Sequence, residues 1–190
     1  MYINGDRFYY NNLIFDIKNF STNVRIRPKS GFVNNTIRPV RIIDGHYNLD
    51  LNSHTGWITS NIFDGGEIKT VANLPTSEVF RADGITYSIE HNKFRDINFE
   101  GGIAAKTFNF VKNVNSNVFD GCRFEAIDDD SIYLGANCLG NKFLNTPYNL
   151  ANKVEVASSS VTWTQDYGQT KEAMGINGHA AFRSKAIIDG

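Results

Sequence analysis

The sequence predicts one all-β domain over residues 1–190, wound as a right-handed parallel β-helix (a β-solenoid) with about 24 residues in each coil. Three observations predict this fold: an Asn-x-Phe triplet that returns at a nearly constant interval, aromatic residues that align between the copies, and a composition of strand and turn formers. The clearest coils span residues 61–150, and residues 151–190 are expected to form irregular or C-terminal coils.

The triplet begins at Asn61, Asn92, Asn117 and Asn141, and its last two intervals are 25 residues (92 to 117) and 24 residues (117 to 141). In register, the copies align Phe94 with Phe119 and Phe143, Phe99 with Phe124 and Tyr148, and Phe108 and Phe110 with Ile132 and Leu134. A short period of strands and turns is satisfied when each repeat wraps once and equivalent residues stack about 4.8 Å apart. Asn side chains at the turns can then bond from coil to coil, and parallel crossovers are almost always right-handed.

The composition supports many short strands joined by tight turns. The chain has 14 Phe and 8 Tyr, which favour pleated surfaces, and 16 Gly but only 4 Pro. Asn is frequent as well, and it tolerates turn conformations. The N-terminal third shows strand signals, such as alternating Leu13, Phe15 and Ile17, without a clear phase. An antiparallel β-sandwich is the alternative fold, which explains the strands but not the aligned columns.

Several functional classes find no support in the sequence. The net charge is −1 without a basic stripe, so no nucleic acid is expected. No apolar run approaches the ~20 residues that cross a bilayer, so we expect no membrane insertion. No phosphate loop, dinucleotide fingerprint or zinc cluster appears, which predicts no cofactor and no metal. Cys122 and Cys138 fall in different columns and are interpreted as two separate buried thiols.

The run from Asn117 to Thr146 resembles the coils of pectate-lyase-like right-handed β-helices, and the Asn-rich, aromatic chain is most similar to bacteriophage tailspikes. This resemblance implies a homotrimer of the virion (phage tail) that acts at the host cell surface, where it binds and depolymerises bacterial capsule or O-antigen polysaccharide. A non-catalytic receptor-binding or scaffolding β-helix of a virion is one alternative, and a bacterial polysaccharide lyase or epimerase is another. The end of the chain, Ala186–Gly190, repeats the pattern of Arg41–Gly45, which suggests a fragment of a longer polypeptide.

Two acidic features are candidate catalytic sites, because cutting a glycosidic bond takes two carboxyl groups roughly 5–10 Å apart. Glu100 and Glu125 each follow an inward Phe and should point outward in one column, on adjacent coils. Lys69 falls in the same column and partly neutralises it, so a solvated acidic face is the alternative.

The second acidic feature is the run Asp128-Asp129-Asp130, which resembles the paired acids of polygalacturonase-type hydrolases but lacks the Gly-His-Gly partner. Counting back from inward Ile132 points Asp129 outward, and Asp128 takes its place if the turn includes Asp130. A polar turn is the alternative interpretation. Three aromatic residues are candidate substrate-binding groups: Tyr133, Trp57 and Trp163. Packing in the core or in an interface is the alternative for both tryptophans.

Overall fold

The computed structural model describes residues 1–70, 76–101, 106–125, 132–145, 154–158, 160–164, 169–176 and 179–186. For residue 132 and for the last four of these ranges it describes the backbone alone. These residues form strands and turns and contain no helix, which confirms the predicted all-β class. The strands belong to three sheets, named A, B and C below.

The strands are listed here by sheet. Sheet A consists of β1 (Tyr2–Ile3), β4 (Thr22–Ile26), β7 (Tyr47–Asn52), β11 (Glu78–Asp83), β15 (Lys106–Lys112), β19 (Ile132–Ala136) and β21 (Val154–Ser158). Sheet B consists of β2 (Arg7–Tyr9), β5 (Gly31–Val33), β8 (Trp57–Thr59), β12 (Ile89–Glu90) and β16 (Val114–Asn115). Sheet C consists of β3 (Asn12–Lys18), β6 (Thr36–Ile43), β9 (Ile62–Asp64), β10 (Glu67–Lys69), β13 (Lys93–Arg95), β14 (Asn98–Glu100), β17 (Val118–Asp120), β18 (Arg123–Glu125), β20 (Asn141–Leu144), β22 (Ser160–Thr164), β23 (Gln169–Ile176) and β24 (His179–Ala186).

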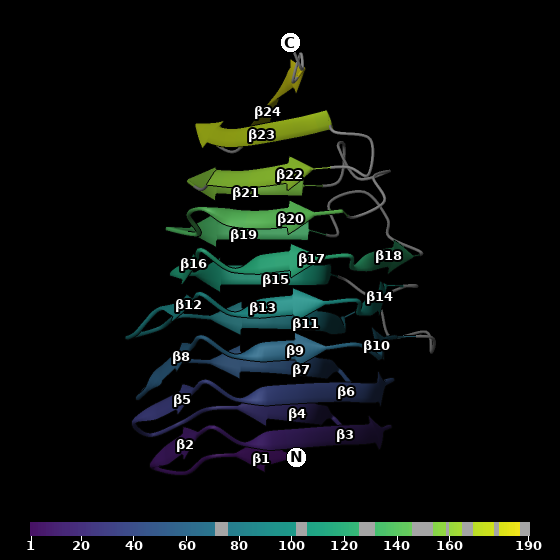
Figure 1. The fold of residues 1–190 in the computed structure, drawn as a ribbon, viewed down its shortest axis with the longest axis vertical. Coiled ribbons are helices and arrows are strands. Elements are labelled where there is room, and N and C mark those ends of the chain that lie inside the picture. Colours follow the sequence, from purple (N-terminus) through teal and green to yellow (C-terminus); the bar gives the residue numbers. More distant parts are fainter. Residues whose placement is uncertain are drawn as a thin grey trace.

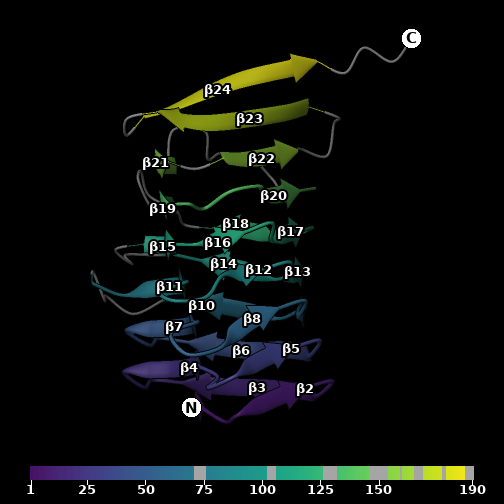
Figure 2. The same cartoon turned by 90° about the vertical axis from the view of Figure 1, so that its left-hand side faces the viewer.

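The chain winds as a right-handed parallel β-solenoid, as predicted. Each coil passes through the sheets in turn and the next coil lies above it, with about 25 residues per coil (Figures 1 and 2). From β1 to β22, strands of neighbouring coils pair in parallel, so the antiparallel β-sandwich is wrong. At the C-terminal end, β22, β23 and β24 pair antiparallel and form a meander on the last coil.

The core is dominated by an internal stack of phenylalanine rings. Phe63, Phe94, Phe119 and Phe143 lie one above another, with successive ring centroids 4.5, 4.5 and 4.7 Å apart. All four are buried, because their strand positions point inward on every coil. The predicted alignment of Phe94, Phe119 and Phe143 is therefore confirmed.

The other predicted columns are present too. Phe99 stacks on Phe124 at 5.6 Å. Phe108 and Phe110 are in register with Ile132 and Leu134. Tyr148, the third member predicted for the Phe99 column, lies outside the described residues.

A ladder of asparagine side chains holds one corner of the solenoid together. Its members are Asn11, Asn35, Asn61, Asn92, Asn117 and Asn141. On each coil the amide oxygen accepts hydrogen bonds from the backbone N–H and the side-chain amide of the Asn one coil below, all at 2.9–3.1 Å. The ladder supplies partners for polar groups that would otherwise be buried without any.

This ladder also sets the phase of the N-terminal coils, for which the sequence indicated strands but no clear phase. Asn11 and Asn35 precede Asn61 by regular intervals and belong to the same ladder. The residues two positions on, Leu13 and Ile37, occupy the Phe63 column. The triplet was not recognised there because its aromatic residue is replaced by an aliphatic one.

Both cysteines are free and buried, as predicted. Cys122 Sγ lies 3.5 Å from the carbonyl oxygen of Phe94, and Cys138 Sγ lies 3.6 Å from that of Phe110. Burial raises the pKa of the Cys122 thiol to about 12, so it stays protonated and unreactive at neutral pH.

Candidate functional site

The outer face of sheet A carries a dense polar network. Along β4, the side chains of Val24 and Ile26 point into the core, so Arg25 between them points outward. On the other coils, the residues in register with Arg25 occupy the same outward position. From the first coil upward, this column consists of Tyr2, Arg25, Asp50, Arg81, Asn109 and Tyr133.

Asp50 is the anchor of this network. Its side chain has no solvent exposure and lies between the guanidinium groups of the coils below and above. Arg25 Nε donates to Asp50 Oδ2, and Arg81 Nη1 lies 3.5 Å from Asp50 Oδ1. A buried carboxylate is tolerated only when it is paired in this way. Asp50 therefore holds two cations in fixed positions but is itself covered from any ligand.

Arg81 gathers two further carboxyl groups. Its Nη2 atom lies 2.8 Å from Asp83 Oδ2, and its Nε atom lies 3.5 Å from Glu78 Oε2. Three acidic side chains thus surround one guanidinium, and a part of the negative charge is left uncompensated.

Glu78 is the most exposed of the three acidic side chains around Arg81, although it remains largely buried, with a side-chain exposure of 17%. Asn109 Nδ2 donates to its Oε1 atom at 2.9 Å, whereas Oε2 has no hydrogen-bond partner. Burial raises the pKa of Glu78, and the nearby Asp50 raises it further, against the lowering effects of Asn109 and Arg81. A carboxyl group that keeps its proton to higher pH is what a general acid requires.

Tyrosine rings orient the cations of the same face. The Arg25 guanidinium lies 5.2 Å from the Tyr2 ring centroid and 5.8 Å from that of Tyr47, and Lys106 Nζ lies 4.9 Å from the Tyr133 centroid. These separations are within the range of cation–π attraction. Tyr133 is therefore on the outer surface, as predicted, and its ring contacts a lysine.

Sheet B carries a different surface, an aromatic strip formed by Tyr9, Trp57 and Tyr87. Trp57 is 50% exposed, and its ring centroid lies 5.0 Å from that of Tyr87. In register below Trp57 is Gly31, where the Tyr9 hydroxyl lies only 3.0 Å from the position a Cβ would take. The missing side chain at Gly31 leaves room for the hydroxyl group of Tyr9, which belongs to β2, two coils below Trp57. Figure 2 turns sheet B toward the viewer.

Glu100 and Glu125 lie on a third surface, the outer side of β14 and β18. They are opposite each other on adjacent coils, and Lys69 occupies the same column, as the repeat predicts. Lys69 Nζ is 4.0 Å from Glu100 Oε2, and Arg123 forms an ion pair with Glu125. Lys69 also pairs with Glu67, at 2.9 Å, so Glu100 shares its cation whereas Glu125 has Arg123 beside it. The catalytic role predicted for Glu100 and Glu125 stays a prediction.

Three other predicted residues cannot be placed with their side chains. Asp128 and Asp129 lie outside the described residues, in the segment 126–131 that connects β18 to β19. Trp163 lies on β22 with its backbone opposite Phe143. Tyr133 belongs to sheet A and Glu100 and Glu125 to sheet C, so the acids and this tyrosine lie on different sheets.

Glu78, Arg81 and Tyr87 were missed from the sequence. They lie in the coil between Asn61 and Asn92, where the interval is 31 residues and the alignment of repeats is lost. One feature of the sequence could have located them: Phe80 is in register with the inward Phe108, so the next residue, Arg81, points outward.

Within the ranges that the structure describes, no group of three or more His, Cys, Asp or Glu side chains could hold a metal ion, and no helix is long and apolar enough to span a membrane. The chain matches no protein-family model, no curated protein and no solved structure.

Proposed function

We propose that this β-solenoid binds a bacterial surface polysaccharide, in the manner of the phage tailspikes that its sequence resembles, as a side-by-side homotrimer of the virion. The observation that carries the proposal is the aromatic strip of sheet B. Its half-exposed Trp57 and neighbouring Tyr87 offer apolar ring surface that the core does not use. The C–H face of a pyranose ring can pack on such a surface while its hydroxyl groups stay in water.

The solenoid supports binding of a linear chain rather than of a small ligand. Tyr9, Trp57 and Tyr87 belong to β2, β8 and the turn before β12, so the strip spans four coils. At about 4.8 Å between coils, this is roughly 14 Å along the axis. Several consecutive sugar residues can therefore contact the strip, which suits an extended polymer.

Replacing the central ring should weaken this binding. We expect Trp57→Ala to lower the affinity for the cognate polysaccharide at least about tenfold, or 1.4 kcal/mol, because the largest exposed aromatic surface of the strip is removed. The measurement is binding to a panel of purified bacterial capsular and O-antigen polysaccharides immobilised on an array, followed by calorimetry for the best binder.

The matched control is Phe20→Ala, which removes another exposed aromatic ring (61% exposed) in the turn between β3 and β4. This variant should bind like the parent. Equal affinity of the parent and Trp57→Ala for every polysaccharide that the parent binds would refute a role for the strip.

Depolymerisation is the second candidate function, and Glu78 is the observation that favours it. We propose Glu78 as the proton donor to the leaving sugar oxygen, since burial raises its pKa and 17% of its side chain is exposed. Glu78→Gln should reduce the release of reducing ends from a bound polysaccharide at least a hundredfold, as for loss of a general acid, while binding persists. Unchanged cleavage by this variant would direct the search to Glu100, Glu125, Asp128 and Asp129.

The raised pKa of Glu78 also predicts a stability effect that needs no substrate. The folded state holds the Glu78 proton more tightly than the unfolded state, so stability falls as pH rises from the ordinary Glu range of about 4.3 through the raised pKa. Gln does not titrate, so Glu78→Gln should melt above the parent at pH 7, and the advantage should shrink below about pH 4. Glu90→Gln, on sheet B, controls for the loss of an acidic side chain, and a Glu78→Gln variant that melts below the parent at pH 7 would contradict the assignment.

A further inference from the structure

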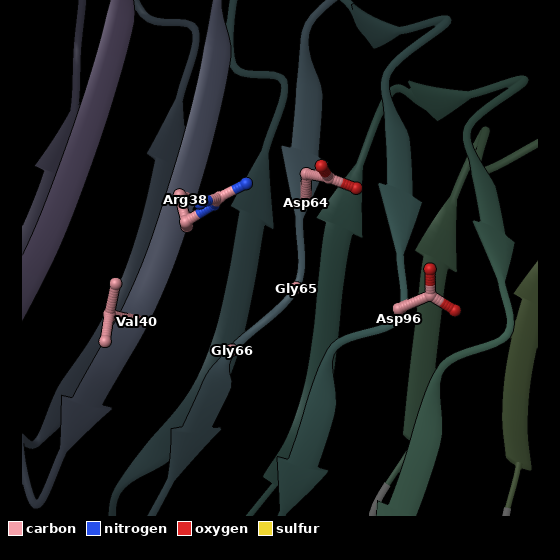
Figure 3. Close-up of a pocket in the computed structure, with 6 residues that line it drawn as sticks. All are labelled: Arg38, Val40, Asp64, Gly65, Gly66 and Asp96. Carbon is pink, nitrogen blue, oxygen red and sulfur yellow. The ribbon is translucent and has the colours of Figure 1, made fainter.

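An open groove of about 440 Å³ lies on the outer side of sheet C, and its lining residues belong to none of the three surfaces described above. Its walls are Arg38 and Val40 of β6, Asp64 at the end of β9, and Asp96 after β13, and its floor is the pair Gly65–Gly66 that joins β9 to β10 (Figure 3). The volume is within the range of small-ligand sites.

The two glycines keep this groove hollow. Gly66 has a φ of +87°, and a Cβ there would lie 1.9 Å from the carbonyl oxygen of Pro39, so no other residue fits. Gly65 has a φ of +69°, and a Cβ there would meet no atom within 4 Å. A side chain at position 65 would therefore project into open space at the floor of the groove, which Gly leaves empty.

The groove presents one free cation and one free anion on opposite sides of this floor. Asp64 is already paired, with its Oδ1 atom 3.0 Å from Arg95 Nη2. Arg38 and Asp96 form no ion pair and no side-chain hydrogen bond within the part of the chain that the structure describes. Figure 3 shows the Arg38 guanidinium extending toward Asp64 and the two carboxylates on the same side of the sheet.

We propose that this groove binds a single pyranose residue with free vicinal hydroxyl groups. Asp96 accepts hydrogen bonds from two neighbouring hydroxyls, Arg38 donates to a ring or hydroxyl oxygen, and the C–H face of the sugar lies over Gly65 and Val40. Charge-assisted hydrogen bonds of this kind are stronger than neutral ones. A metal ion is disfavoured, because Asp64 is already paired with Arg95 and the groove also presents the guanidinium group of Arg38.

The groove adds a second subsite to the proposed function, for one residue or side branch of the same polysaccharide. The inference rests on the proposed function only in taking the sugar to come from that polysaccharide. Simple glycosides can test it without any polymer. We expect one of methyl glucoside, methyl galactoside or methyl mannoside, titrated to tens of millimolar, to shift the amide resonances of Gly65 and Gly66 saturably in ¹⁵N NMR spectra.

Gly65→Asn is the blocking variant, because Asn tolerates a positive φ and its side chain would fill the groove. Gly140→Asn is the matched control: Gly140 has a φ of +67° in the turn before β20, and a Cβ there makes only an ordinary 3.5 Å contact with Ser116 Oγ. Gly65→Asn should abolish the saturable shift, at Gly66 and its neighbours, and Gly140→Asn should retain it. Arg38→Gln, which leaves the backbone unchanged, should weaken it severalfold and gives an independent test if Gly65→Asn does not fold.

The outcomes separate this inference from the proposed function. Shifts at Gly65 and Gly66 that persist in Trp57→Ala would show that the groove binds sugar independently of the aromatic strip. No saturable shift with any of the three glycosides would overturn the inference, whatever the polysaccharide array shows. Shifts that are equally large in Gly65→Asn and in Arg38→Gln would place the sugar elsewhere and overturn it as well.

Discussion

Phe119→Ala should lower the free energy of unfolding by about 3–5 kcal/mol, the usual cost of deleting a buried aromatic side chain. Phe119 is fully buried at the centre of the phenylalanine stack, with the rings of Phe94 and Phe143 at 4.5 and 4.7 Å and that of Phe108 edge-on at 5.3 Å. The coils above and below are fixed by their own hydrogen bonds, so the cavity left by the ring cannot collapse. Urea unfolding followed by circular dichroism measures the loss.

Phe20→Ala provides the comparison, because the same side chain is removed from a position that is 61% exposed. Its free energy of unfolding should stay within about 0.5 kcal/mol of the parent, as for ordinary surface substitutions. If Phe119→Ala unfolded at the same urea concentration as Phe20→Ala, the phenylalanine stack would not be a main source of stability.

Asn92→Ala should lower the free energy of unfolding by about 3–5 kcal/mol, as much as the loss of a core aromatic residue. Several buried polar groups lose their hydrogen-bond partner, and each such loss costs about 1–3 kcal/mol. The Asn92 side chain donates to the carbonyl oxygen of Ile58 and to Asn117 Oδ1, and accepts from the backbone and side-chain amides of Asn61. Alanine leaves these partners buried without a replacement. Urea unfolding again gives the value, and hydrogen exchange should show faster exchange of the Asn61 amide.

The comparison here is Asn137→Gly, which removes an exposed Asn whose φ of 58° glycine adopts without strain. This change should cost less than about 1 kcal/mol, as for most surface positions. A cost below 1 kcal/mol for Asn92→Ala would mean that water enters the corner and replaces the lost amide.

The repeat, the solenoid and its inward columns could be predicted from the sequence. Phe94, Phe119 and Phe143 return at 24–25 residues because each inward position must fit the ring above and below it, so packing selects the same residue type on every coil. Asn recurs in the triplet for a similar reason, because each side-chain amide must form hydrogen bonds with the Asn of the neighbouring coil. The N-terminal coils escaped prediction because Leu13 and Ile37 fill the same column as the aromatic rings.

The surfaces were decided by the tertiary structure. Asp50 and Arg81 are 31 residues apart in the chain, and they meet because β7 and β11 pair in register, which places the two residues directly opposite each other. The groove depends on two glycines in left-handed conformations between β9 and β10. Apart from the column of Lys69, Glu100 and Glu125, outward positions leave little periodic trace in the sequence, because solvent accepts almost any polar side chain on each coil. The amino-acid sequence alone therefore determined the period and the core, whereas the stacking of coils of unequal length determined which outward charges and aromatic rings come together.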